Sequence, residues 1–202
     1  MKKIGIMGGT FDPIHYGHLN IANAAKSAFA LDFILFIPTG VSYMKEGVSS
    51  NLHRFEMTKL AIRNREDFYI NDIEINREGN TYTCDTLKSL KSEYSDAEFY
   101  FICGTDTLFM LEKWKNFTYL FQNMSFLLAS RPDQMLTLQQ NKMEELSLNY
   151  DAQIQVLPVE PLDISSSSIR EYLKQNRSYD SYLENRISKQ VFDYIISNQL
   201  YL

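Results

Sequence analysis

Short apolar runs alternate along the chain with stretches in which apolar residues recur near the helical period. Runs such as "KKIGIM" and "DFILFIP" are typical of buried strands, and the alanine-rich stretch "LNIANAAKSAF" is typical of an amphipathic helix. Strands that alternate with helices predict a doubly wound (Rossmann-like) α/β fold, a parallel sheet with helices on both faces. We expect strands at 2–7, 32–38, 68–75, 98–103, 125–130 and 153–158, and helices at 17–29, 52–63, 83–94 and 134–148.

The last part of the chain has a different pattern. After residue 164 only helical periodicity remains, and Ile187, Val191, Tyr194 and Ile195 share one face of a last helix. A length of 202 residues suits one domain. We therefore expect residues 1–202 to form a single domain, in which 165–202 is a small helical C-terminal subregion.

The loop after the first strand reads "GGTFDPIHYGH" and combines glycines with two histidines. Gly8 and Gly9 allow a close approach of the backbone to a ligand, and His18 falls in the first turn of the following helix, near the positive end of its dipole. With His15 beside it, this arrangement suits phosphate oxygens. A metal site is disfavoured, because only Asp12 lies near enough in sequence to add a third ligand.

A second candidate, "ISSSSIR", lies about 150 residues further on, at 164–170. A serine run is commonly a linker, but this one leads directly into the helical stretch "IREYLKQ". Serines are good N-caps, the first N–H groups of a helix are free, and Arg170 lies one turn in, where it can reach an anion. The segment therefore predicts a second helix N-terminus that binds a negatively charged group.

Charge and composition narrow the class of protein. The formal net charge of −5 argues against a general nucleic-acid binder, and the apolar share of 45% is ordinary for a soluble globular protein. No apolar run approaches a membrane helix or the core of a signal peptide, so we expect a cytoplasmic protein without a membrane partner. Cys84 and Cys103 are expected to be buried or half-buried thiols.

The first segment resembles the T/H-x-G-H signature of the nucleotidyltransferase superfamily, and "ISSSSIR" is similar to the "ISSTxIR" motif of the same superfamily. The resemblance implies transfer of a nucleoside monophosphate to a phosphate-bearing acceptor, with release of pyrophosphate and with Mg²⁺ carried by the ATP phosphates rather than by a protein metal site. It implies that His15, His18 and Arg170 are catalytic. The implied ATP-binding residues are Gly8, Gly9, Thr10, Phe11, His15, His18, Gly104, Asp106, Ile164, Ser165, Ser166 and Arg170.

Three further segments, "NTYTCDTL", "GTDTLFMLEKW" and "PTGVSYMK", resemble the nicotinate-nucleotide adenylyltransferase family over essentially the whole chain. This resemblance implies ATP and nicotinate mononucleotide as substrates and deamido-NAD as product. Met44 stands where the family often has a histidine, beside Lys45. The implied acceptor-binding residues are Thr10, Lys45, Tyr82, Thr83, Trp114 and Arg131.

The residues themselves leave several alternatives open at the acceptor end. "NTYTCDTL" reads as a turn into a helix with Thr81 or Thr83 as N-cap, and such a helix end attracts a carboxylate more than an amide. Trp114 is either a core residue or a stacking partner, and Asp106 is either an N-cap or a ribose ligand.

Other functions also stay open. The acceptor could be nicotinamide mononucleotide or phosphopantetheine, and a nucleotide sensor without turnover is a different class of protein. The sequence leaves the oligomeric state undecided, a homo-oligomer included.

Overall fold

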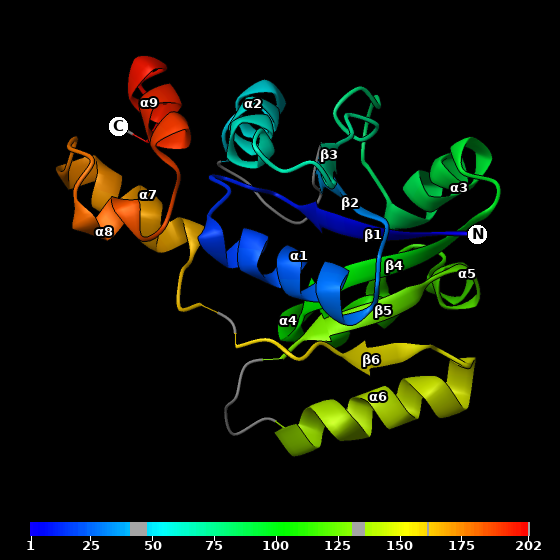
Figure 1. Cartoon of the computed structure of the whole chain (residues 1–202). Helices are drawn as coiled ribbons and strands as arrows, with labels where there is room; N and C mark the ends of the chain where they lie inside the picture. Colours follow the sequence, from blue (N-terminus) through cyan, green and yellow to red (C-terminus); the bar gives the residue numbers. More distant parts are fainter. Residues whose placement is uncertain (41–47, 131–135, 161, 202) are drawn as a thin grey trace.

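In the computed structural model, which describes residues 1–40, 48–130, 136–160 and 162–201, six parallel strands form one sheet in the order β3-β2-β1-β4-β5-β6 (Figure 1). This confirms the predicted doubly wound fold. The strands are β1 (Lys2–Gly9), β2 (Phe33–Pro38), β3 (Phe68–Ile70), β4 (Ala97–Gly104), β5 (Ser125–Ala129) and β6 (Ile154–Val156). The helices are α1 (Tyr16–Ala28), α2 (Asn51–Ile62), α3 (Thr83–Glu93), α4 (Thr105–Leu108), the 3₁₀ turn η1 (Leu111–Lys113), α5 (Phe117–Asn123), α6 (Leu136–Tyr150), α7 (Ser166–Gln175), α8 (Ser181–Glu184) and α9 (Lys189–Ser197).

Strand β1 lies at the centre of the sheet, between β2 and β4. Its apolar run is buried on both faces, as a continuous apolar run in a parallel sheet predicts. Ile6 pairs with Leu35 of β2 on one side and with Phe101 of β4 on the other. The chain therefore leaves β1 toward one half of the sheet and later returns to build the other half beside it, so that the carboxyl end of β1 is the switch point.

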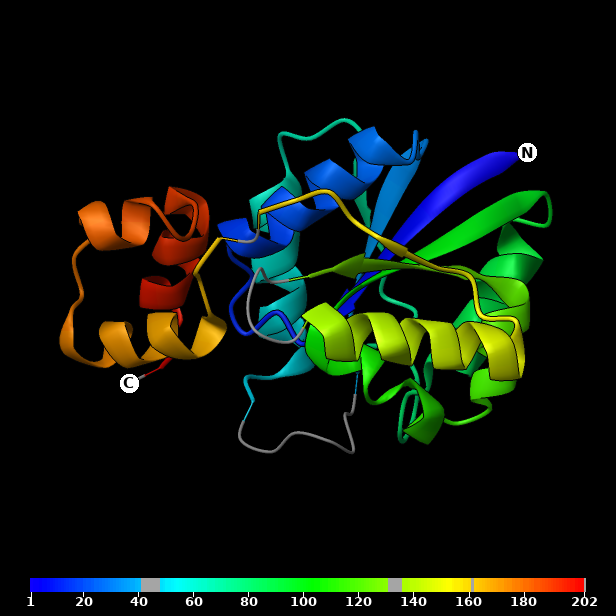
Figure 2. The same ribbon diagram turned by 90° about the horizontal axis from the view of Figure 1, so that it is seen from below.

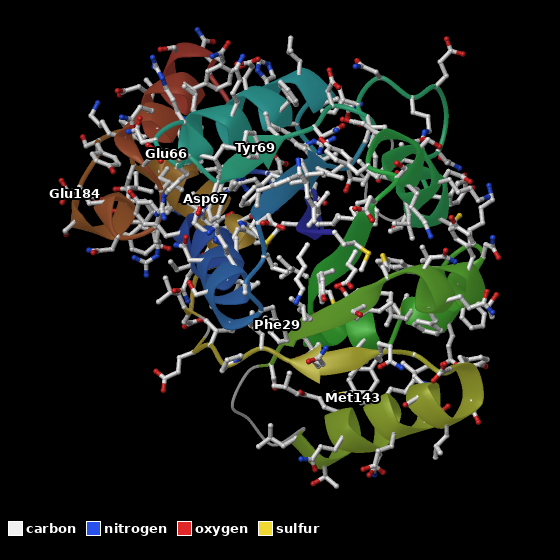
Figure 3. The ribbon with its side chains drawn as sticks, turned by 45° about the vertical axis from the view of Figure 1, so that its right-hand side comes forward. Phe29, Glu66, Asp67, Tyr69, Met143 and Glu184 are labelled. Atoms are coloured by element: carbon white, nitrogen blue, oxygen red, sulfur yellow. The ribbon has the colours of Figure 1, made fainter. Side chains whose placement is uncertain are left out.

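Helices cover both faces of the sheet and separate the core into two apolar clusters. One cluster joins one face of the sheet to α1, α2 and α7–α9, and the other joins the opposite face to α3–α6. Figure 3 shows Met143 pointing from α6 toward β6, where it packs on the second cluster. On the other face, Asp67 lies beside α1, and its carboxylate is 2.8 Å from Lys26 Nζ.

The C-terminal helices lie beyond the carboxyl ends of the strands, beside the start of α1 (Figure 2). Leu183 and Val191 are fully buried in the same cluster as Ile14, so these helices share a core with the main sheet. The hydroxyl of Tyr194 on α9 lies 3.0 Å from Nδ1 of His53 on α2. The expected helical end of the chain is thus present, and it closes one side of the loop that follows β1.

Two parts of the chain differ from the expected elements. The strand expected at 68–75 ends at Ile70, because the side chain of Asn71 accepts a hydrogen bond from the N–H of Ile73, at 2.9 Å, and turns the chain. The segment 105–123 contains the short helices α4, η1 and α5, which were not expected. Each is shorter than the window over which helical periodicity shows.

In the described part of the chain, no helix is both long and apolar enough to cross a membrane. Cys84 and Cys103 are both buried free thiols, as expected.

The contact between the loop after β2 and the segment after β3 gives a test of the fold. A Cβ on Gly40 would lie 2.1 Å from the carbonyl oxygen of Glu74. We expect Gly40→Ala to lower the free energy of unfolding by about 1–3 kcal/mol, because neither backbone can yield without moving its loop. Urea unfolding measures the change.

Gly104→Ala is the matched control, since a Cβ there meets nothing within 4 Å and the residue has an ordinary φ of −93°. Equal stability of the two variants would contradict the tight junction at Gly40.

Candidate functional site

A cavity of about 580 Å³ opens at the carboxyl ends of β1, β2 and β4. This is the switch point of the sheet, where ligands bind in doubly wound folds. Residues from the loop after β1, the start of α3 and the α4–η1 segment form its wall. Nine of the predicted site residues line it: Gly8, Gly9, Thr10, His18, Tyr82, Thr83, Gly104, Asp106 and Trp114.

The two histidines lie together at the start of α1. His15 is the N-cap, and the His15 and His18 rings are stacked with centroids 3.8 Å apart. The backbone N–H of His15 donates to Nδ1 of His18 at 3.2 Å, so in the neutral His18 ring the proton is on Nε2. Gly17 is required here, because a Cβ would lie 2.9 Å from Nδ1 of His15.

His15 is itself buried, with 7% of its surface exposed. Burial lowers its pKa to about 4, so the ring is neutral near pH 7. Within the described residues, its buried Nδ1 has no hydrogen-bond partner.

Phe11 lies in the core behind this pair rather than on the cavity wall. It is 2% exposed and meets the His18 ring edge to face, at 5.1 Å between centroids. The residue has a positive φ of 51°, which turns the chain between β1 and α1. The Phe11 side chain therefore supports His18 from behind.

The second motif reaches the first through two hydrogen bonds. A serine of the run caps α7, as expected: Ser165 accepts from the N–H of Ser168. Ser166 Oγ donates to the carbonyl of Pro13 at 2.9 Å, and Arg170 donates to the carbonyl of Asp12 at 2.7 Å. The two segments, far apart in sequence, thus meet at one loop.

Arg170 and Ser167 also line a second, polar recess of about 360 Å³ beside this loop. Ile164, just before α7, is half-buried against the first core cluster.

At the far end of the cavity, Tyr82 is the N-cap of α3, so the expected caps Thr81 and Thr83 are both wrong. Tyr82 has the extended backbone of an N-cap but makes no side-chain cap, and Thr83 is the first helical residue. Trp114 is half-buried, lines the cavity and meets the Phe101 ring edge to face at 5.4 Å. Trp114 thus both packs on the core and lines the cavity.

Asp106 is exposed in the second position of α4, so it is not the N-cap, which is Gly104. Two predicted acceptor ligands, Lys45 and Arg131, lie outside the described residues, as does Met44.

A buried arginine that the sequence analysis did not identify holds the site loops together. Arg54 on α2 is 1% exposed and donates to the carbonyls of Thr10 at 2.8 Å and Thr39 at 2.6 Å. Further bonds reach the carbonyls of Gly40 and Ser49 and the side chain of Asn51. The sequence feature that could have identified Arg54 is its position on the same helix face as the buried apolar residues of α2.

Glu74 is the second residue that the sequence analysis missed. It lines the cavity at 8% exposure, and Thr86 Oγ1 donates to its carboxylate at 2.8 Å. Burial raises the pKa of Glu74, although hydrogen bonds from Thr86 and Thr81 oppose the rise. The carboxyl thereby joins the start of α3 to the loop after β3.

Known proteins resemble this chain in sequence along most of its length. The family model described as cytidylyltransferase-like matches residues 6–172. A probable nicotinate-nucleotide adenylyltransferase of Lachnoclostridium phytofermentans is 39% identical, with all of both chains covered. A protein of the same name from Bacillus licheniformis is also 39% identical, over 100% of this chain and 99% of its own.

The fold is also that of solved structures. Plasmodium falciparum nicotinic acid mononucleotide adenylyltransferase complexed with NaAD superposes with a TM-score of 0.81 at 24% identity, over 100% of this chain and 98% of that one. At that identity the likeness concerns the fold alone. The full-length sequence relatives, together with the family model, show that this chain belongs to the cytidylyltransferase-like family and, within it, to the nicotinate-nucleotide adenylyltransferases.

Proposed function

We propose that this enzyme transfers the adenylyl group of ATP to nicotinate mononucleotide, giving nicotinate adenine dinucleotide and pyrophosphate. The observation that carries the proposal is one cavity with two different ends. A glycine loop with His18 forms one end, and Tyr82, Thr83 and Trp114 form the other. The first end suits phosphates and the second a flat ring, so two nucleotides fit with their phosphates meeting between them.

The reaction is an in-line displacement that needs no protein nucleophile. A phosphate oxygen of the acceptor forms a bond to the α-phosphorus of ATP, and the bond from that phosphorus to the bridging oxygen breaks, so pyrophosphate leaves with the electron pair. The protein's part is to position both phosphates and to neutralise charge. We assign this task to the Nε2–H of the neutral His18 ring, because its Nδ1 accepts from the backbone N–H of His15.

The second motif supplies the remaining groups for the triphosphate. The N-terminus of α7 and Arg170 are bonded to the loop that carries the histidines, so they favour anions close to it. Mg²⁺ bound with ATP would offset the charge of the phosphates. In the described residues, no group of three or more His, Cys, Asp or Glu side chains is placed to hold a metal.

Cytoplasmic location and the roles of Lys45 and Arg131 stay predictions from the sequence, and the oligomeric state stays undecided. For the acceptor, the nearest alternatives are nicotinamide mononucleotide and phosphopantetheine. The alternative from another class is a sensor that binds ATP without turnover.

The function itself is tested by mixing the purified protein with ATP, Mg²⁺ and each acceptor in turn while pyrophosphate is followed. We expect nicotinate mononucleotide to give the highest kcat/KM, because only this acceptor carries a ring carboxylate for the start of α3. Faster release of pyrophosphate with another acceptor would reassign the substrate. ATP binding without release of pyrophosphate with any acceptor would support the sensor.

His18→Ala should lower turnover about 100- to 1000-fold, the usual cost of removing one preorganised donor to a transition state. The loss of the bond from the His15 N–H should cost only about 1 kcal/mol of stability. Steady-state kinetics and thermal unfolding separate the two effects. Turnover close to that of the unsubstituted protein would remove His18 from the phosphate contacts.

His15 makes stability depend on pH. Its pKa is about 4 in the folded protein, below the ordinary value of 6.5, so the unfolded chain binds more protons between these values. The contribution of the neutral His15 ring to the free energy of unfolding is fully present above pH 6.5 and is lost as pH falls toward 4. Between pH 7 and pH 5 the loss is about 2 kcal/mol.

Urea unfolding of the unsubstituted protein and of His15→Gln at both pH values checks this. The variant, which cannot titrate at this position, should lose less stability on acidification. An identical loss in both proteins would show that His15 is not the group that titrates.

A further inference from the structure

Lys115 lies at the acceptor end of the cavity, directly after Trp114 and on the turn between η1 and α5. Its Nζ is 4.2 Å from the centroid of the Tyr82 ring, which is the N-cap of α3. Among the cavity-lining residues of the described chain, Lys115 is the only lysine or arginine. A cation and a helix N-terminus, both favourable to negative charge, therefore share one wall.

The charges around Lys115 leave a positive excess. Its Nζ is 3.2 Å from Oδ2 of Asp85, whose Oδ1 lies 3.7 Å from Nζ of Lys88. Burial raises the pKa of Asp85, but the hydrogen bond from Lys115 and the charges of both lysines outweigh this, so the pKa lies below its usual value. One carboxylate thus faces two ammonium groups.

We propose that Lys115 determines the specificity for the acid form of the acceptor, by pairing its ammonium group with the ring carboxylate of nicotinate mononucleotide. This rests on the proposed function and names a residue that selects its substrate. Lys115 and Asp85 keep 53% and 36% of their side-chain surfaces exposed, and exposed pairs of this kind are weak. The ammonium group can therefore turn from Asp85 to an acceptor carboxylate at little cost.

The two acidic side chains on the cavity wall do not provide this selection. The Glu74 carboxyl is engaged by Thr86, and Asp106 lies exposed at the start of α4, in the nucleotide-binding segment of the sequence motif. The carbonyl oxygen of a neutral amide can accept a hydrogen bond from an ammonium group, but only a carboxylate also gains the attraction of opposite charges. Lys115 therefore favours the acid without a penalty on the amide.

Lys88 offers a matched control, because it faces the same Asp85 from one turn along α3 but is not part of the cavity wall. The variants are Lys115→Met and Lys88→Met, with Lys115→Arg to keep the charge. For each, kcat/KM is measured with nicotinate and with nicotinamide mononucleotide at saturating ATP. Thermal unfolding confirms that each variant is folded.

Lys115→Met should lower kcat/KM for the acid about tenfold, mainly by raising KM. A tenfold loss corresponds to the lower end of the free energy of a hydrogen bond to a charged group. The kcat/KM with the amide should change less than about twofold, so the preference for the acid over the amide falls about tenfold. Lys88→Met should keep the preference, and Lys115→Arg should keep most of it.

An unchanged preference in Lys115→Met, or an equal loss with both acceptors, would overturn the role of Lys115 while leaving the proposed function in place. An equal fall in Lys88→Met would also overturn it, since the effect would then belong to Asp85. Absence of turnover by the unsubstituted protein with either acceptor would overturn both the proposed function and this inference.

Discussion

The loops that form the cavity depend on one buried guanidinium group. Arg54 points its donors at the carbonyl oxygens of loops that follow two different strands, among them those of Thr10 after β1 and Thr39 after β2. Burial lowers the pKa of Arg54, and the charges of Asp12, Tyr201 and Glu74 oppose this. A planar guanidinium with five N–H donors can hold several carbonyls at once, which an ammonium group cannot do. One side chain thereby ties the start of the loop after β1 to the start of the loop after β2.

Asp12 connects the loop after β1 to the C-terminal helices. Its carboxylate accepts from the Tyr201 hydroxyl at 2.6 Å and from the N–H of Ser49 at 3.1 Å, and its carbonyl accepts from Arg170. Asp12 is 3% exposed, so the bonds from Tyr201 and Ser49 replace water that the carboxylate has lost. The hydrogen bonds of Ser166 and Arg170 to the carbonyls of this loop hold α7 near the histidines, and α8 and α9 add apolar packing.

The sequence predicts those parts of the molecule in which the signal is local. The strands, the long helices, the pairing of "HYGH" with a helix start and the cap at Ser165 each arise within a few residues, so periodicity and capping rules reach them. The short helices of 105–123 and the early end of β3 are not predicted, because a single turn at Asn71 or a four-residue helix is too short to show a hydrophobic period. Arg54 and Glu74 are missed for another reason. Arg54 shares a helix face with apolar residues, but the pairing of each charged group with other elements, such as Arg54 with Thr10 and Glu74 with Thr86, is seen only in the fold.

The proposed acceptor subsite also has one part that the sequence predicts and one part that only the fold shows. From the sequence, "NTYTCDTL" contains no cation, so the N–H groups at the start of α3 alone would have to favour a carboxylate. That effect reaches at most about 2 kcal/mol and is weakened by solvent and salt. The fold adds Lys115, which lies 30 residues after Asp85 in sequence and 3.2 Å from it in space. In the proposed subsite, a helix end would fix where the carboxylate lies, while the cation on a flexible stem would add charge without demanding geometry. Selection of an acid over its amide would then come from two elements that are far apart in sequence and meet only in the fold, where Lys115 reaches the start of α3.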